Sequence, residues 1–149
     1  VLFEGNPFVG EVLLDNTALD HVQKLSMFMS PLSQNEILFL KSGEASVSLP
    51  DLLTDVMRRK LLRRTRRQKG EISLPDLENI EKRASSAYGE LQNAWKFGHV
   101  IPNHDGEDNE NWDAFYYPLG DARKALEAFV SLLRGDEATG VEEWDQDLI

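Results

Sequence analysis

Cysteine is absent from all 149 residues of the chain, which excludes a disulfide framework, a thiolate metal site and a cysteine nucleophile. Long apolar runs are also missing, and no stretch approaches the roughly 20 apolar residues that a membrane-spanning helix needs. The N-terminal residues lack the pattern of a secretory signal peptide. We therefore expect an intracellular protein, cytoplasmic or nuclear, that makes no contact with a membrane.

Catalytic motifs are missing as well. The three histidines, His21, His99 and His104, accompany many serines and acids, but no serine lies in a nucleophile elbow and no glycine-rich loop follows a predicted strand. Carboxylates at helical spacing, such as Glu78 and Glu81, fit a solvent-exposed face better than an acid–base pair. We predict that the chain is not an enzyme and that it takes no cofactor and no small-molecule substrate.

Residues 99–113 combine two histidines with several acids, so a metal site must be considered there. An EF-hand loop needs glycine at its sixth position and acids at its first and twelfth. Placing Gly106 sixth puts Ile101 first and Trp112 last, and the match fails. The two histidines are five residues apart on an expected loop, which is not the one-turn spacing of a zinc site. We predict no metal and interpret this segment as a solvated acidic loop.

Helix-capping signals recur along the chain. A serine or threonine followed three residues later by an acid satisfies free backbone N–H groups at a helix start. This pattern occurs at Thr17 with Asp20, Ser33 with Glu36, Ser48 with Asp51, and Ser73 with Asp76. Each pair precedes a segment whose apolar residues recur every three or four positions. The repeated pattern favours a helical protein.

The apolar periodicity predicts five main helices. We expect them at residues 18–29, 34–41, 49–67, 74–96 and 121–134. The third and fourth should pack as an antiparallel hairpin joined by a short turn. The predicted fold class is therefore mainly α, a single-domain bundle of about five helices.

The chain divides into three predicted parts. Residues 1–16, with Gly5, Pro7 and Gly10 among apolar residues, are expected to form a short extended N-terminal arm. Residues 17–135 form the helical domain, and residues 136–149 form an acidic tail.

Basic residues are concentrated in one segment of an otherwise acidic protein. The chain carries a net charge of −10, yet residues 57–70 contain eight basic side chains and no acid. These residues, called the basic segment below, are Arg58, Arg59, Lys60, Arg63, Arg64, Arg66, Arg67 and Lys69. At 100° per residue, Arg64 and Arg67 reach the helix face that Leu53 and Val56 occupy earlier. The last two turns are thus basic on every side and must meet water or anions, because burial would cost too much free energy.

Three interpretations of the basic segment remain open. Its charges could complement the negative end of the helix and nearby acids, including the acidic tail, within the chain or an oligomer. It could contact nucleic acid, with guanidinium groups neutralising phosphates. It could also act as a nuclear-import signal. The aromatic residues that stack on bases are not interleaved with it, which weighs against the second interpretation.

Two aromatic segments are candidate protein-binding sites. Trp112, Phe115 and Tyr116 belong to an aromatic run whose default role is to pack the last helix onto the bundle, though part of it could form an exposed patch. In the tail, the string Glu-Glu-Trp-Asp at 142–145 is followed by Leu148. This string resembles the acidic tryptophan peptides that dock into grooves of other proteins, and the resemblance implies that Trp144 anchors such a contact. A tail folded back onto the basic segment is the competing interpretation.

Opposed charge at different places in one chain favours contacts between proteins. Our first hypothesis is a non-enzymatic interaction or assembly module, a subunit or adaptor that binds a protein partner or itself. The alternative hypothesis is a nucleic-acid-binding accessory protein that acts through residues 58–69.

Overall fold

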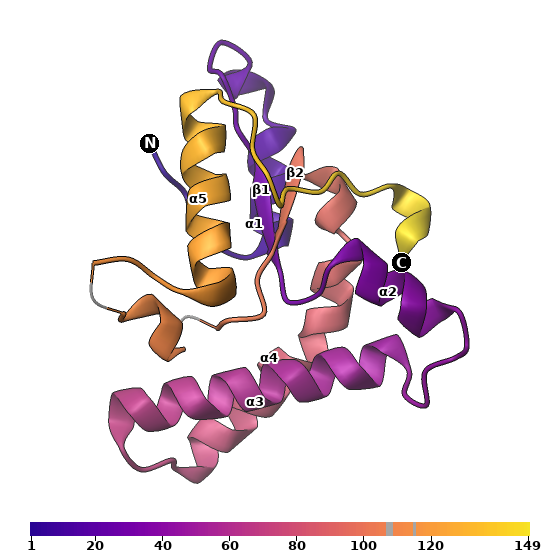
Figure 1. Ribbon diagram of the computed structural model, residues 1–149, viewed down its shortest axis with the longest axis vertical. Coiled ribbons are helices and arrows are strands. Elements are labelled where there is room, and N and C mark those ends of the chain that lie inside the picture. Colours follow the sequence, from indigo (N-terminus) through magenta and orange to yellow (C-terminus); the bar gives the residue numbers. More distant parts are fainter. Residues whose placement is uncertain (107–108, 115) are drawn as a thin grey trace.

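The computed structural model describes residues 1–106, 109–114 and 116–149. Within those residues the chain forms five α-helices and a two-stranded parallel sheet (Figure 1). The elements are α1 (Pro7–Leu14), β1 (Met27–Ser30), α2 (Gln34–Lys41), α3 (Leu49–Lys69), α4 (Leu74–Leu91), β2 (His99–Pro102) and α5 (Gly120–Arg134). Short 3-10 turns lie at Thr17–Leu19, Ala94–Lys96, Glu110–Trp112 and Gln146–Leu148. The predicted class, mainly α with about five helices, is confirmed.

Serine caps set the starts of the three central helices. The Ser33 hydroxyl caps α2 and the Glu36 carboxylate accepts in return from the Ser33 backbone N–H at 2.7 Å, which completes a capping box. Ser48 caps α3 by accepting from the backbone N–H of Asp51. Ser73 does the same for α4. Two of the four predicted capping pairs, Ser33 with Glu36 and Ser73 with Asp76, form complete capping boxes, and Ser48 caps α3 without a return bond from its backbone N–H to the Asp51 carboxylate.

Helices α3 and α4 pack as an antiparallel hairpin that lies below the sheet in Figure 1. Near the start of α3, the fully buried Leu53 shares a core cluster with Leu91 at the end of α4. Further along α3, Leu61 packs with Ile80 near the start of α4. Gly70 ends α3 with a positive φ of 78°, a conformation that glycine adopts without steric cost. The predicted hairpin is confirmed, and its tip carries the end of the basic segment.

The parallel sheet joins strands that are far apart in the sequence. Met27 aligns with His99 and Ser30 with Pro102, and the crossover between the two strands contains α2, α3 and α4. The strand β2 is buried on both faces. Val100, 0% exposed, belongs to the cluster that includes Leu53. Ile101, 1% exposed, packs against α5.

The helix predicted over residues 18–29 does not form. Asn16, not Thr17, caps the short turn at Thr17–Leu19, and the chain then extends into β1. The local apolar spacing is compatible with a helix, but pairing with β2 satisfies the backbone polar groups of this segment and lets Met27 pack beside Ile101. The same pairing forms β2 from residues 99–102, which were predicted from the sequence to lie in a loop.

The extended N-terminal arm predicted over residues 1–16 is wrong for half of its length. Residues 7–14 form α1, because the Asn6 side chain accepts from the backbone N–H of Phe8 at 2.9 Å and Pro7 suits the first helical position. Gly10 faces the ring of Phe97, and a Cβ there would lie 3.1 Å from it. Glycine and proline therefore serve helix initiation and close packing here instead of marking an extended arm.

Candidate functional site

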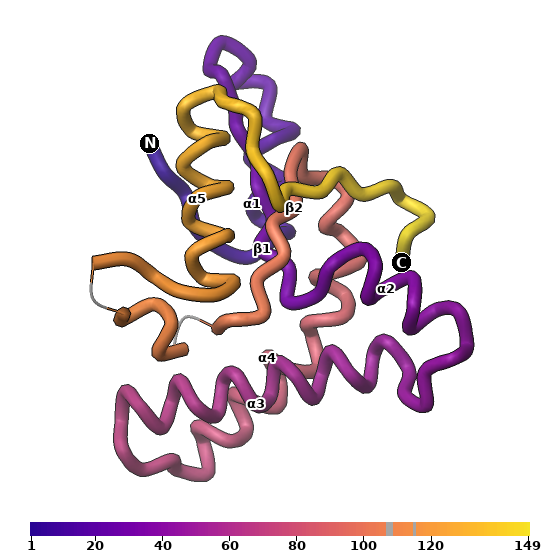
Figure 2. Tube along the Cα trace, viewed as in Figure 1, coloured from indigo at the N-terminus to yellow at the C-terminus, as the bar shows by residue number. Residues whose placement is uncertain are grey.

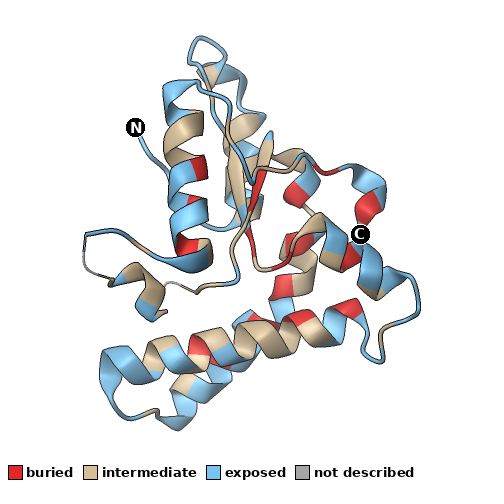
Figure 3. Cartoon of the chain, in the orientation of Figure 1, coloured by how far each residue is buried: buried red, intermediate tan, exposed pale blue. Residues whose placement is uncertain are grey.

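The basic segment forms the second half of α3 and lies at the surface. Its exposed members are Arg59, Arg63, Arg66, Arg67 and Lys69, and its half-buried members are Arg58, Lys60 and Arg64. Leu61, 5% exposed, is the last buried residue of α3. Figure 3 shows the same change along the hairpin, from buried and half-buried residues in its middle to exposed residues at its tip. The helix therefore leaves the core where its leucines end.

Arginines at the start of the basic segment pair with acids of the same chain. Arg58 donates from Nε and Nη2 to the two carboxylate oxygens of Glu81, both at 2.7 Å, and so links α3 to α4. The hydrogen bonds from Arg58 lower the pKa of Glu81. Arg59 pairs with Asp55 one turn earlier on α3, and this contact lowers the pKa of Asp55. Both pairs are exposed, so they direct the side chains more than they stabilise the fold.

The tip of the hairpin is also tied to acids. Lys69 bonds Asp76 in the first turn of α4, and this contact, with the hydrogen bonds from Ser73, lowers the pKa of Asp76 to about 2. Arg67 pairs with Asp113, beyond the end of the sheet. These contacts agree with the interpretation in which neighbouring acids of the same chain complement the basic segment. The acidic tail contacts a lysine elsewhere, since Lys41 donates to the backbone carbonyls of Asp147 and Leu148.

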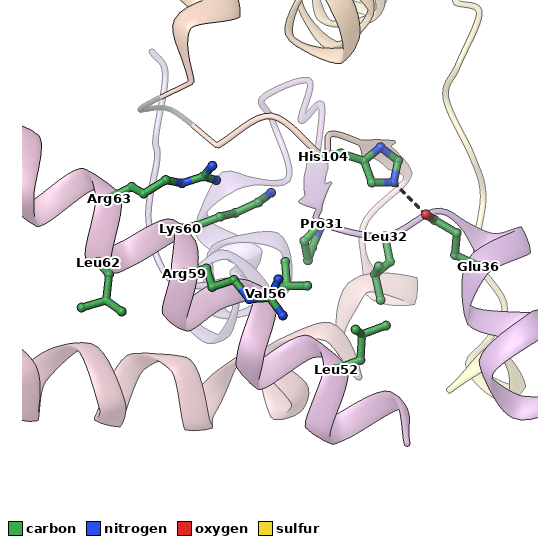
Figure 4. Close-up of a pocket in the computed structure, with 10 residues that line it drawn as sticks. All are labelled: Pro31, Leu32, Glu36, Leu52, Val56, Arg59, Lys60, Leu62, Arg63 and His104. Atoms are coloured by element: carbon green, nitrogen blue, oxygen red, sulfur yellow. Dashed lines mark hydrogen bonds and ion pairs between the residues drawn. The ribbon is translucent and has the colours of Figure 1, made fainter. Parts of the chain in front are cut away.

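An open groove runs along the side of α3 that faces the turn between β1 and α2 (Figure 4). We call it the α3 groove, and its volume is about 670 Å³. Its apolar lining consists of Pro31, Leu32, Leu52, Val56 and Leu62. Its polar lining consists of Glu36, Arg59, Lys60, Arg63 and His104. The groove therefore combines an apolar floor with three cations from the basic segment.

The groove lining changes character along α3. Leu52, Val56, Arg59 and Arg63 follow one another at steps of three and four, which places them on one helix face. The first two are apolar and the last two are cationic. Figure 4 shows Lys60 and Arg63 extending from α3 in similar directions, while Leu52 and Val56 lie nearer the turn at Pro31 and Leu32. Along this face of α3 the groove lining thus changes from apolar to positively charged, while Glu36 and His104 line the opposite wall beside Leu32.

His104 closes the groove by linking two helices. Its Nε2 lies 2.8 Å from a carboxylate oxygen of Glu36 on α2, and its Nδ1 contacts Asp121 in the first turn of α5. Burial lowers the pKa of His104, but the hydrogen bonds to Glu36 and Asp121 raise it by more, so the net direction is upward. Burial raises the pKa of Glu36, and the hydrogen bonds from Ser33 and His104 lower it to below its ordinary value. His104 therefore bridges two carboxylates, and both contacts favour its protonated form.

Asp105 holds the chain next to His104 in place. Its carboxylate accepts from the side-chain amides of Asn109 at 2.8 Å and Asn111 at 2.9 Å, and from the backbone N–H of Ala122 at 2.9 Å. The Asp105 carboxylate therefore has a structural role, because three donors of the surrounding loop and of α5 bind it. Across the parts of the chain that the structure describes, no group of three or more histidine, aspartate or glutamate side chains is arranged so that it could hold a metal ion.

The aromatic candidates divide between surface and interior. Tyr116 is 82% exposed and has a positive φ of 73°, and Trp112 is half-buried. The Trp112 indole nitrogen is buried without a hydrogen-bond acceptor among residues 1–106, 109–114 and 116–149. Phe115 lies outside the described residues. Of the three, Tyr116 is the side chain that the structure places on the surface.

The tail residues Trp144 and Leu148 are not surface anchors. They are 5% and 6% exposed and belong to the main core cluster. Glu142 pairs with Val100 of β2 through two backbone hydrogen bonds of 2.8 Å, and Lys41 donates to the carbonyl of Leu148 at 2.7 Å. Figure 2 shows the tail passing from β2 to α2. The predicted docking role of both residues is therefore corrected, because their side chains already fill this chain's own core.

Comparison of the chain with known protein families, with curated proteins and with solved structures found no match in any of the three. Among the described residues, no helix has both the length and the apolar composition to cross a lipid bilayer. The cationic part of the α3 groove lies within residues 58–69, which the sequence marks as basic, and the helical spacing of Leu52 and Val56 is a signal for its apolar floor. Nothing in the local sequence indicated the opposite wall, which comes from Pro31, Leu32 and His104.

Proposed function

We propose that the chain is a non-enzymatic protein-interaction or assembly module that works inside the cell, in the cytoplasm or nucleus. The α3 groove is the single observation that carries this proposal, because it offers a partner both an apolar floor and three cations. Apolar burial supplies affinity in protein contacts, and charges at the rim select partners and speed association.

Charge distribution supports a partner that is acidic where it meets α3. The whole chain has a net charge of −10, whereas residues 57–70 contain eight basic side chains and no acid. The ion pairs of Arg59 with Asp55 and of Arg67 with Asp113 are exposed on both sides, and exposed pairs exchange partners at small free-energy cost. An acidic partner can therefore replace these acids without unfolding the hairpin.

Size-exclusion chromatography with light scattering, at low and high salt, tests the proposal. We expect self-association or capture of a defined partner that weakens as salt rises, because salt screens exposed charges. The quadruple variant Arg63→Gln, Arg64→Gln, Arg66→Gln and Arg67→Gln should weaken the same association. A strict monomer at both salt concentrations, together with no partner in pull-downs, would contradict the proposal.

A nucleic-acid-binding accessory protein is the second candidate function. The observation that favours it is the surface position of all eight basic side chains along α3. Binding of this kind weakens linearly on a plot of log affinity against log salt concentration, because phosphates release counterions. The same quadruple variant should abolish it. The absence of measurable RNA and DNA binding at low salt would eliminate this candidate, and the net charge of −10 already weighs against it.

A further inference from the structure

We infer that the α3 groove binds a short acidic segment of a partner protein, with an apolar side chain on Leu52 and Val56 and carboxylates against Arg59 and Arg63. This inference rests on the proposed function and names the chemistry of the partner. It follows from the order of the lining residues on one face of α3, where the apolar Leu52 and Val56 precede the cationic Arg59 and Arg63.

Distances along α3 define the spacing that the segment must have. Val56 and Arg63 are seven residues apart, which corresponds to about 10 Å along an α-helix. An extended peptide covers that distance in about three residues, and a helical peptide in about two turns. The segment therefore carries its apolar anchor and its first carboxylates between three and seven positions apart. Either chain direction satisfies this spacing.

The lining favours a peptide over nucleic acid. A single-stranded nucleic acid binds through aromatic side chains that stack on its bases. Among the described residues no Phe, Tyr or Trp lines the groove, and the one aromatic ring in its lining, that of His104, is bonded to Glu36 and Asp121. A polar sugar–phosphate chain lying on Leu52 and Val56 would bury little apolar surface of its own, so it would gain little free energy from this floor. An aliphatic or aromatic anchor with acids beside it uses both ends of the groove.

At one end of the groove His104 bridges two carboxylates, those of Glu36 and Asp121, so this end stays net negative and rejects a further carboxylate. The Glu36 carboxylate lies in the wall and accepts from His104 at 2.8 Å. An acid of the partner placed near Glu36 would meet a like charge, whereas an acid near Arg63 would meet a cation. The same two charges therefore fix the order of anchor and acids along α3.

Fluorescence anisotropy with the full chain tests the inference. The probe is a fluorescein-labelled peptide of about 12 residues, a length typical of groove-binding segments, with leucines in one half and glutamates in the other. A second probe has the two halves in reverse order. Control peptides replace the leucines by serine or the glutamates by glutamine. We expect each control to bind about tenfold more weakly than its parent, because each removes one half of the contact.

Two arginines on the same helix provide matched protein variants. Arg63 lines the groove, and Arg66 is exposed but does not line it. Arg63→Gln should weaken peptide binding about fivefold or more, while Arg66→Gln should change it less than about twofold. Circular dichroism melting curves of both variants check that each retains the fold.

Four results distinguish the possibilities. Dependence on the leucines together with a larger effect of Arg63→Gln than of Arg66→Gln supports the inference. Binding that ignores the leucines and falls equally in both variants overturns it and leaves a charge-driven protein contact, so the proposed function stands. A single-stranded RNA oligonucleotide that binds more tightly than every peptide overturns it in favour of nucleic acid. If neither peptide binds at low salt, the inference is also overturned. The proposed function is then tested separately by the chromatography experiment.

Discussion

The indole Nε1–H of Trp144 donates a hydrogen bond of 2.7 Å to the carboxylate of Glu142. The same carboxylate oxygen accepts from the backbone N–H of Gln34, at the start of α2, at 2.9 Å. One acid of the tail thus positions the indole and satisfies a backbone donor that α2 cannot satisfy internally. The acidic tail is part of the fold because its only tryptophan lies in the core and its Glu142 carboxylate accepts both bonds.

The first prediction concerns Trp144. Replacing it by alanine should lower the free energy of unfolding by about 3–5 kcal/mol, because the change removes a buried aromatic side chain and leaves a cavity. Urea denaturation followed by circular dichroism measures this. Tyr117, 66% exposed, provides the control, and Tyr117→Ala should cost less than about 0.5 kcal/mol. If Trp144→Ala leaves stability unchanged, the tail is not part of the core.

A second prediction follows from His104. Its folded pKa is raised, so its bridge contributes fully to stability below the ordinary pKa of 6.5 and is lost as the pH rises through the folded value. The pKa values of Glu36 and Asp121 are lowered, so their share is present above their ordinary values of 4.5 and 3.8 and is lost as the pH falls further. The bridge should therefore be strongest between pH 4.5 and 6.5.

Urea denaturation of the wild type and of His104→Asn, at about pH 5.5 and pH 8.5, checks this dependence. The stability difference between the two proteins should be larger at the lower pH. Proton NMR titration of the ring should place the midpoint of His104 above 6.5, and Glu36→Gln should lower that midpoint by removing one acceptor. A wild-type midpoint at or below 6.5 would show that the bridge does not form.

The third prediction concerns Asp76 at the tip of the hairpin. Its pKa of about 2 results first from Lys69 and then from the hydrogen bonds of Ser73. Lys69→Gln and Ser73→Ala should each raise this pKa, as measured by carbon-detected NMR titration. The stability that Asp76 contributes is present above its ordinary pKa of 3.8 and is lost as the pH falls toward 2, so both variants should lose less stability in acid than the wild type. Glu78, on the same helix, is a control carboxylate for the titration. An unchanged pKa in both variants would mean that neither group bonds Asp76 in solution.

The helices that could be predicted from the sequence are those with their own local signals. Helices α2, α3 and α4 each begin at a serine that the sequence marks by an acid three residues later, and α3 ends at Gly70 as its position suggests. The cationic end of the α3 groove was equally predictable, because a run of basic residues on every helix face cannot enter an apolar core. Local chemistry decides these features, and a single sequence contains it.

The sheet, the tail and half of the groove depend on contacts between distant residues. Met27 pairs with His99 across the whole α2–α4 crossover, and Trp144 fills a core built by α2, α3 and α4. Such contacts depend on how distant parts of the chain pack together, and the periodicity of a local segment carries no information about that packing. Likewise, His104 reaches Glu36 only because the loop after β2 passes α2. The aromatic character of the tail was visible in the sequence, but its burial was not.

The fourth prediction uses two neighbouring leucines of α3 to separate stability from binding. Leu53 is fully buried between α3 and α4, whereas the adjacent Leu52 is half-buried and lines the groove. Leu53→Ala should therefore cost about 2–5 kcal/mol of unfolding free energy, in the range for a buried leucine. Leu52→Ala should cost less, because part of its surface is already in water.

Binding should show the opposite order. Leu52→Ala removes part of the groove floor and should weaken binding of the leucine–glutamate peptide, with little effect on its serine-substituted control. Leu53→Ala, measured at a temperature where it remains folded, should bind the peptide as the wild type does, since its side chain points into the hairpin core. Equal losses of binding in the two variants would mean that the peptide senses overall stability instead of the groove, because only Leu52 lines the surface where the peptide is expected to lie.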